Sequence, residues 1–136
     1  MHIYVIEAIN IPKTDITSKS DPYVVFKFEG DKIGIKTKVL DNTLTPQWNE
    51  LVDLLITNSN ENLFVEIWDK NIRKDKLICS TKLDTKKYMN FEPHYEWIKI
   101  NNVYLNLVIH VKPSGDIFIT PEQVQYYQLS PIPNTK

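Results

Sequence analysis

Carboxylates cluster at two places where an apolar run gives way to a polar loop. Asp15 and Asp21 lie on either side of one short loop segment, and Asp21 directly precedes a run of strand-forming residues. A second cluster begins at Asp69, directly after the apolar run 63–68, and includes Asp75. If both loops lie at the same end of a sheet, their carboxylate oxygens converge and repel one another unless a hard cation holds them. Calcium takes about six to eight oxygen ligands, so the pattern predicts a calcium site.

Length and composition favour a single globular domain. The chain has 136 residues, 42% of them hydrophobic, and a net charge of −1, which is typical of a folded domain and argues against a dedicated nucleic-acid binder. The lone Cys79 cannot form an intramolecular disulfide, which favours a reducing compartment. No apolar run approaches the roughly 20 residues of a membrane span, and no signal peptide precedes the first expected strand. We therefore expect a cytoplasmic protein.

Hydrophobic residues alternate with a period of two through most of the chain, which is typical of half-buried strands. Polar turn residues separate the runs, and no long helical pattern is present. The expected strands are 3–8, 22–28, 33–39, 51–56, 63–68, 77–83, 95–100 and 103–111. Asn101 and Asn102 are expected to form the loop of a two-residue hairpin, and residues 86–89 a helical turn. The pattern predicts an all-β, eight-stranded antiparallel sandwich.

The character of the chain changes after Pro113. The stretch 120–123, Thr-Pro-Glu-Gln, carries a helix-start signature with Thr as the cap and Pro in the first turn. Val124 and Tyr127 would give this short helix an apolar side, and the prolines at 131 and 133 would end it. We therefore expect a β-sandwich domain over residues 1–113 and a C-terminal extension over 114–136, which could also contact a protein partner.

Several motifs resemble those of the C2 domain family, the β-sandwiches that bind calcium and phospholipid. They are Ser-Asp-Pro-Tyr-Val at 20–24, Thr-Pro-Gln-Trp-Asn-Glu at 45–50 and Val-Glu-Ile-Trp-Asp at 65–69. The resemblance covers about residues 1–113 and implies a Greek-key sandwich. Because the chain starts on the strand that leads into Asp15, it is similar to the permuted form called type II topology.

The resemblance implies which residues hold calcium. Carried over by position, the ligands are Asp15, Asp21, Asp69, Asn71 and Asp75. The chain departs from the family pattern in its third loop, which is one residue short: Lys76 stands where the last aspartate falls, and Cys79 where the family has glycine. Asn71 offers an oxygen without charge, and ligand charge helps to set calcium affinity. We expect one calcium ion, bound more weakly than by a full aspartate set.

Cationic and apolar loop residues suggest that the partner is an anionic phospholipid membrane surface. Near such a surface each Lys or Arg contributes on the order of 1 kcal/mol. Ile16 and Ile72 lie in mid-loop, where they could enter the interface. A second basic patch is expected on one strand face, as in family members that contact phosphoinositides. The residues expected to contact lipid are Lys19, Lys70, Ile72, Arg73 and Lys74 in the loops, and Lys36 and Lys38 in the patch.

Other functions stay open at this point. The departures at Asn71 and Lys76 also favour a calcium-independent module that binds proteins, or binds lipid through its basic patch alone. Isolated aspartates at strand ends are common as turn and cap residues, and surface lysines are often only solvated. An enzyme is not expected, because three glycines provide no phosphate loop and no nucleophile lies near a histidine in a known motif.

Overall fold

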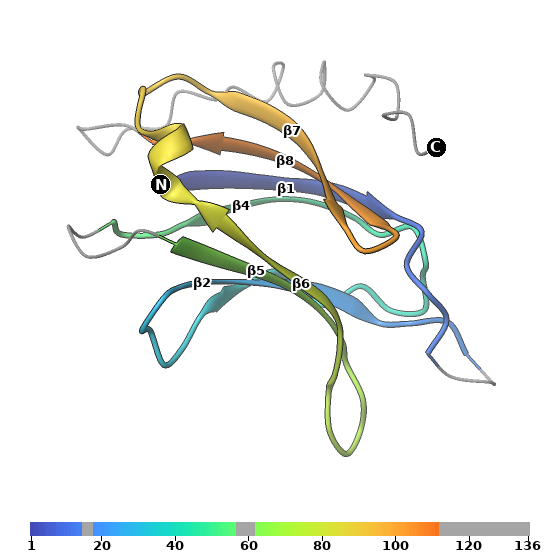
Figure 1. Ribbon diagram of the computed structural model, residues 1–136. Helices are drawn as coiled ribbons and strands as arrows, with labels where there is room; N and C mark the ends of the chain where they lie inside the picture. The colour runs from blue at the N-terminus through green and yellow to red at the C-terminus, as the bar shows by residue number, and fades with distance from the viewer. Residues whose placement is uncertain (15–17, 57–61, 112–136) are drawn as a thin grey trace.

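The computed structural model describes residues 1–14, 18–56 and 62–111, which form two facing antiparallel sheets (Figure 1). The sheets are four-stranded, with strand orders β4-β1-β8-β7 and β3-β2-β5-β6. The elements in chain order are β1 (His2–Ile9), β2 (Pro22–Phe28), β3 (Ile35–Lys36), β4 (Gln47–Asp53), β5 (Asn62–Asp69), β6 (Lys76–Asp84), the 3-10 helix η1 (Thr85–Tyr88), β7 (His94–Ile100) and β8 (Val103–His110). The all-β, eight-stranded sandwich predicted from the sequence is confirmed.

Alternation along the strands builds the core between the sheets. One face of each strand supplies aliphatic and aromatic side chains, and the other face looks outward. The fully buried residues of the core, with 0% exposure, include Ile3, Val5, Val24, Phe26, Leu63, Val65, Ile67, Leu105, Leu107 and Ile109. The packed inner faces hold the strand ends, and therefore the loops, in fixed relative positions.

Two strands differ from the expected ranges by more than one residue at an end. The third was expected over 33–39, but β3 covers only Ile35–Lys36. At Thr37 the side-chain Oγ1, in place of a backbone carbonyl oxygen, accepts the hydrogen bond from Val24 N at 2.9 Å. The fourth was expected over 51–56 but begins at Gln47 and ends at Asp53. Its first residues pair with the end of β1, where the register shifts between Val5 and Glu7.

Short connections are fixed by local polar contacts. The expected helical turn is η1, which starts one residue earlier than predicted and is capped by Asp84, whose carboxylate accepts from Lys86 N at 3.0 Å. Asn101 has φ 56° in the β7–β8 turn, as the predicted hairpin requires. The expected boundary at 113 and the expected C-terminal helix lie outside the described residues. No helix in the described ranges is long and apolar enough to cross a membrane.

Candidate functional site

The two acidic loops lie at one end of the sandwich, away from the N-terminus (Figure 1). They are neighbours because β2 and β5 pair antiparallel with Pro22 opposite Asp69, so that β2 starts where β5 ends. Lys70 N donates to the carbonyl oxygen of Asp21 at 3.0 Å, which continues this pairing into the loops. The expectation that the β1–β2 and β5–β6 loops share one pole therefore agrees with the structure.

Asp69 joins the two loops. It is the last residue of β5 and is 1% exposed. One carboxylate oxygen accepts from Asp21 N at 2.8 Å, and the other accepts from the Thr14 hydroxyl. A buried carboxylate requires such donors because it has lost its hydration. The same position gives Asp69 access to both loops, which is the property expected of a shared metal ligand.

Asp21 connects this junction to a third loop. Its Oδ1 accepts from Asn42 N at 2.6 Å, and the side-chain oxygen of Asn42 in turn accepts from Lys19 N at 3.0 Å. Asn42 adopts φ 52°, a left-handed conformation that asparagine tolerates. The segment between β3 and β4 therefore holds the Asp21 carboxylate in place, while the Lys19 side chain is exposed.

Asp75 accepts hydrogen bonds from a different set of donors than Asp21 and Asp69 do. Its Oδ2 accepts from the Tyr23 hydroxyl at 2.5 Å, and its Oδ1 accepts from Asn71 N at 3.1 Å. Lys70 Nζ lies 3.8 Å from the same Oδ2. These contacts, the Tyr23 hydrogen bond first, lower the pKa of Asp75, while burial and the adjacent carboxylate raise the pKa of Tyr23. Asp75 is therefore held as an anion against Tyr23 of β2.

Between the loops lies a hollow of about 460 Å³. Its walls carry more positive than negative charge. The lining residues are Ser18, Asp21, Lys70, Asn71, Ile72, Arg73, Lys74 and Lys76. Ile72 is fully exposed at the loop tip. The expected lipid-contacting residues of the β5–β6 loop are thus brought together around the hollow.

The candidate calcium ligands are only partly brought together. Asp21 and Asp69 meet at the loop junction, Asn71 lines the hollow and Asp75 turns toward Tyr23. Asp15 and Ile16 lie outside the described residues. Over residues 1–14, 18–56 and 62–111, no three His, Cys, Asp or Glu side chains lie close enough together to hold a metal ion.

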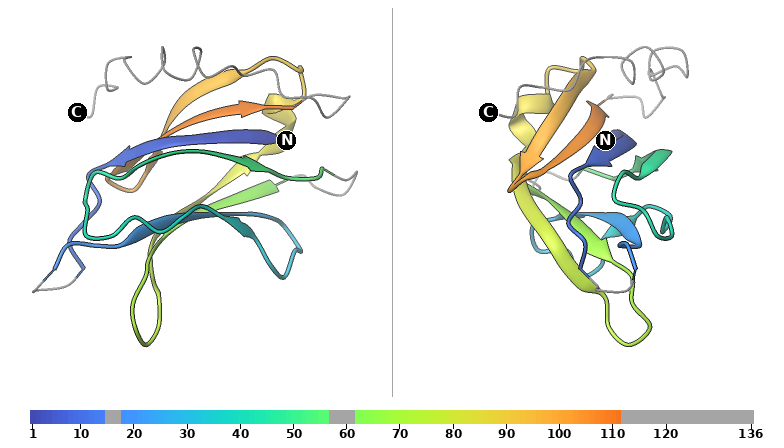
Figure 2. Two further views of the ribbon diagram at one scale, coloured as in Figure 1. Left: turned by 180° about the vertical axis from the view of Figure 1, so that it is seen from behind. Right: turned by 90° about the vertical axis from the view of Figure 1, so that its right-hand side faces the viewer.

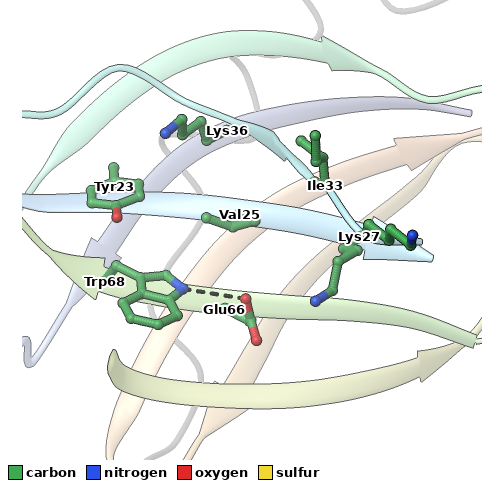
Figure 3. Close-up of a pocket in the computed structure, with 9 residues that line it drawn as sticks. Tyr23, Val25, Lys27, Ile33, Lys36, Glu66 and Trp68 are labelled. Carbon is green, nitrogen blue, oxygen red and sulfur yellow. Dashed lines mark hydrogen bonds between the residues drawn. The ribbon is translucent and has the colours of Figure 1, made fainter. Parts of the chain in front are cut away.

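A second hollow, of about 300 Å³, lies on the outer face of the β3-β2-β5-β6 sheet (Figure 3). We call it the groove; it is lined by Tyr23, Val25, Lys27, Lys32, Ile33, Gly34, Lys36, Glu66 and Trp68. Lys36 Nζ lies 5.8 Å from the centre of the Tyr23 ring, within the range of a cation–π contact. Trp68 Nε1 donates to Glu66 Oε1 at 3.2 Å. The groove thus combines ammonium groups with aromatic surface.

The groove differs from the expected basic patch. Lys36 lines it, whereas Lys38 is exposed outside it, and Lys38 N donates to Glu50 Oε2 at 2.9 Å. Tyr23 and Trp68 were missed, because neither was among the residues expected to contact lipid. Alternation along β2 could have indicated Tyr23, because it places residue 23 on the face opposite to the core residue Val24. Tyr23 contributes its ring to the groove and its hydroxyl to Asp75.

Comparisons of the sequence with known proteins point to one family. A family model described as C2 domain matches residues 1–100. Extended synaptotagmin-1 of Rattus norvegicus is 29% identical over 131 residues, which cover 91% of this chain and 11% of that protein. Synaptotagmin-5 of Arabidopsis thaliana is 27% identical over 114 residues, which cover 82% of this chain and 20% of that protein. The chain therefore spans a minor part of the length of these relatives.

Solved structures give the same fold. The calcium-bound pair of C2 domains from extended synaptotagmin 2 superposes with a TM-score of 0.71 and 24% identity, over 80% of this chain and 44% of that one. A single C2 domain of plant extended synaptotagmin 1 gives a TM-score of 0.70 and 22% identity, over 79% of this chain and 88% of that one. At these identities the likeness establishes the fold alone.

Proposed function

Because the chain belongs to the C2 domain family, whose members are in general calcium- and phospholipid-binding modules, we propose that it is a calcium-responsive module that binds anionic membranes. The binding surface is the hollow between the β1–β2 and β5–β6 loops. One observation carries the proposal: Asp69, buried at the strand end, hydrogen-bonds residues of the β1–β2 loop at the base of a loop rich in cations. The role is binding rather than catalysis, on the cytosolic face of a membrane.

The chemistry of the donor set suits calcium. Aspartate and asparagine oxygens are the ligands that this cation prefers, and Asp21, Asp69 and Asn71 offer them around one loop junction. Asp15 and Asp75 complete the proposed ligand set. Bound calcium supplies positive charge that offsets the carboxylates. For its part, Asp75 must exchange the Tyr23 hydrogen bond for coordination, which makes the site weaker than one with a free carboxylate.

The rim of the hollow suits an anionic membrane. Lys70, Arg73 and Lys74 each contribute on the order of 1 kcal/mol near such a surface, so together they raise affinity by roughly two orders of magnitude. Full burial of the exposed Ile72 side chain adds about 1.5–3 kcal/mol. Lys19, at the edge of the same pole, extends the positive charge.

Sedimentation with phosphatidylserine vesicles tests the proposal. The intact protein should pellet with calcium and stay in solution with chelator. Asp69→Asn should lose the calcium dependence, whereas Asp31→Asn, in the exposed β2–β3 connection, should behave as wild type. Because Asp69 is buried, the melting temperatures of Asp69→Asn and the wild type must also be compared without calcium. Equal pelleting with and without calcium contradicts the calcium part of the proposal.

The groove supports a second candidate function, calcium-independent binding of a phosphorylated lipid headgroup. The supporting observation is the set of three lysines, Lys27, Lys32 and Lys36, beside the Tyr23 and Trp68 rings. Lys36→Ala should then weaken binding to phosphoinositide vesicles in chelator, and Lys38→Ala, outside the groove, should have a smaller effect. Equal losses for the two variants would indicate non-specific attraction instead.

A further inference from the structure

The outer face of the β4-β1-β8-β7 sheet has a buried apolar centre that points away from the core, beside the buried polar residues Asn106 and His110. Ile6 and Val108 are 0% exposed and form a cluster separate from the main core, with Tyr4 and Tyr95 packed against them. Register places three of these residues together: Tyr4 pairs with Val108, and Val108 pairs with Tyr95. We call these four residues the outer cluster.

The two outer faces of the sandwich contrast sharply. All eight residues of β8 are buried, so both of its faces are covered. On the other sheet, the outer face carries exposed residues such as Ser80 and Lys82 and contains the open groove. An outward sheet face is ordinarily solvated and polar. The outer cluster therefore requires a covering layer.

No strand or helix of the described ranges provides that layer. The eight strands form the two sheets, and β1 and β8 have no described element over their outward side (Figures 1 and 2). The loop before β7 reaches only the end of the face, where the carbonyl oxygen of Phe91 lies 3.0 Å from Nε2 of His110. Burial also raises the pKa of Glu7, on the neighbouring part of β1.

We propose that residues 112–136 of the same chain dock across the outer cluster. The segment starts directly after Val111, at the end of β8, which is an inner strand of this sheet. Its 25 residues (136 − 112 + 1) could extend about 80 Å, whereas the eight residues of β8 span about 26 Å. The segment is long enough to turn and return along the whole face.

The composition of the segment suits this role. Eight of its residues are apolar or aromatic and only four are charged, so it can present apolar surface to the sheet at a small cost in buried charge. The helix-start signature at 120–123 places Val124 and Tyr127 one helical turn apart, on one side. That side provides the apolar surface for the outer cluster, whereas Gln125 falls on another side.

Methyl NMR and thermal unfolding of the full chain test the docking. The double variant Val124→Ser/Tyr127→Ser should shift the methyl resonances of Ile6 and Val108, leave those of the core residue Ile67 unchanged, and lower Tm by at least about 4 °C. The control Gln125→Ser, on another side of the expected helix, should change neither. Because the substitutions are in the segment itself, a change at Ile6 and Val108 reports contact between the segment and the outer cluster.

Two results would overturn the proposal. If the double variant leaves both the outer-cluster resonances and Tm as in wild type, the segment does not cover this face. If the Ile6 and Val108 resonances instead change on dilution, together with a dimer-to-monomer transition in light scattering, a second copy of the chain is the occupant. Neither result affects the proposed loop function, which is measured by vesicle binding at the loop hollow.

Discussion

Replacing Tyr23 by Phe removes one hydroxyl that restrains a candidate calcium ligand. In the structure this hydroxyl donates to Asp75 Oδ2, and the hydrogen bond is the first cause of the lowered Asp75 pKa. If Asp75 coordinates calcium, the hydrogen bond stabilises only the calcium-free state. Tyr23→Phe should therefore destabilise the calcium-free protein and strengthen calcium binding.

The size of the effect follows from the contact. A hydrogen bond to a charged group contributes about 1.5–3 kcal/mol; the Asp75 side chain is 23% exposed, so we use the lower end. About 1.4 kcal/mol corresponds to a tenfold change in an equilibrium constant. We therefore expect calcium affinity to rise by roughly tenfold, and the free energy of unfolding without calcium to fall by about 1.5 kcal/mol.

The pH dependence gives an independent check. A carboxylate whose pKa is lower in the folded state contributes stability above its unfolded pKa of about 3.9, and loses that contribution as pH falls through the folded pKa. Without calcium, the stability difference between wild type and Tyr23→Phe should be full at pH 6 and narrow below about pH 4. Carbon-detected NMR should show the Asp75 pKa returning upward in the variant.

Isothermal titration with calcium is the decisive assay, and Tyr88→Phe is the matched control. The Tyr88 hydroxyl donates to Glu96 Oε2 at 2.9 Å, so that variant also loses a tyrosine–carboxylate hydrogen bond. It should lower stability without changing calcium affinity. If Tyr23→Phe raises the Asp75 pKa but leaves calcium affinity unchanged or reduces it, Asp75 is not a ligand and our reasoning is wrong.

Three further perturbations test separate parts of the structure. Gly34→Ala should lower Tm, because a Cβ there would lie 2.6 Å from Val25 Cγ1, and such overpacking costs about 1–3 kcal/mol. Thr14→Val should destabilise the protein by about 1–3 kcal/mol in denaturant titrations, because it removes a donor from the buried Asp69. Cys79, with a pKa raised to about 11 by burial, should react slowly with a thiol reagent at pH 8 and quickly after unfolding.

Strand positions could be predicted because alternation is a local property. The range of the eighth strand was predicted to within one residue, because every second position of the strand, including Leu105 and Leu107, is apolar. The short β3 could not be predicted, because its end depends on the Thr37 side chain bonding to Val24, 13 residues earlier. A side-chain hydrogen bond that replaces a backbone hydrogen bond between strands leaves no periodic pattern in the sequence.

The site was predictable only to the level of strand ends. Asp69 and Asp21 were placed at one pole because each follows or precedes an apolar strand, and the structure joins them by a 2.8 Å hydrogen bond. The orientation of Asp75 depends on Tyr23, which is 52 residues away in sequence. Such a contact is decided by how β2 packs beside β5, and no spacing in the sequence encodes it.

If Asp75 coordinates calcium, Tyr23 makes that ion and an occupant of the groove thermodynamically dependent on each other. Its ring lines the groove while its hydroxyl restrains Asp75, so the ion and a groove ligand would each alter the free energy of the same side chain. Linkage is reciprocal: whatever factor an ion imposes on headgroup affinity, the headgroup must impose on ion affinity. A domain built in this way would respond to the coincidence of two signals rather than to either alone.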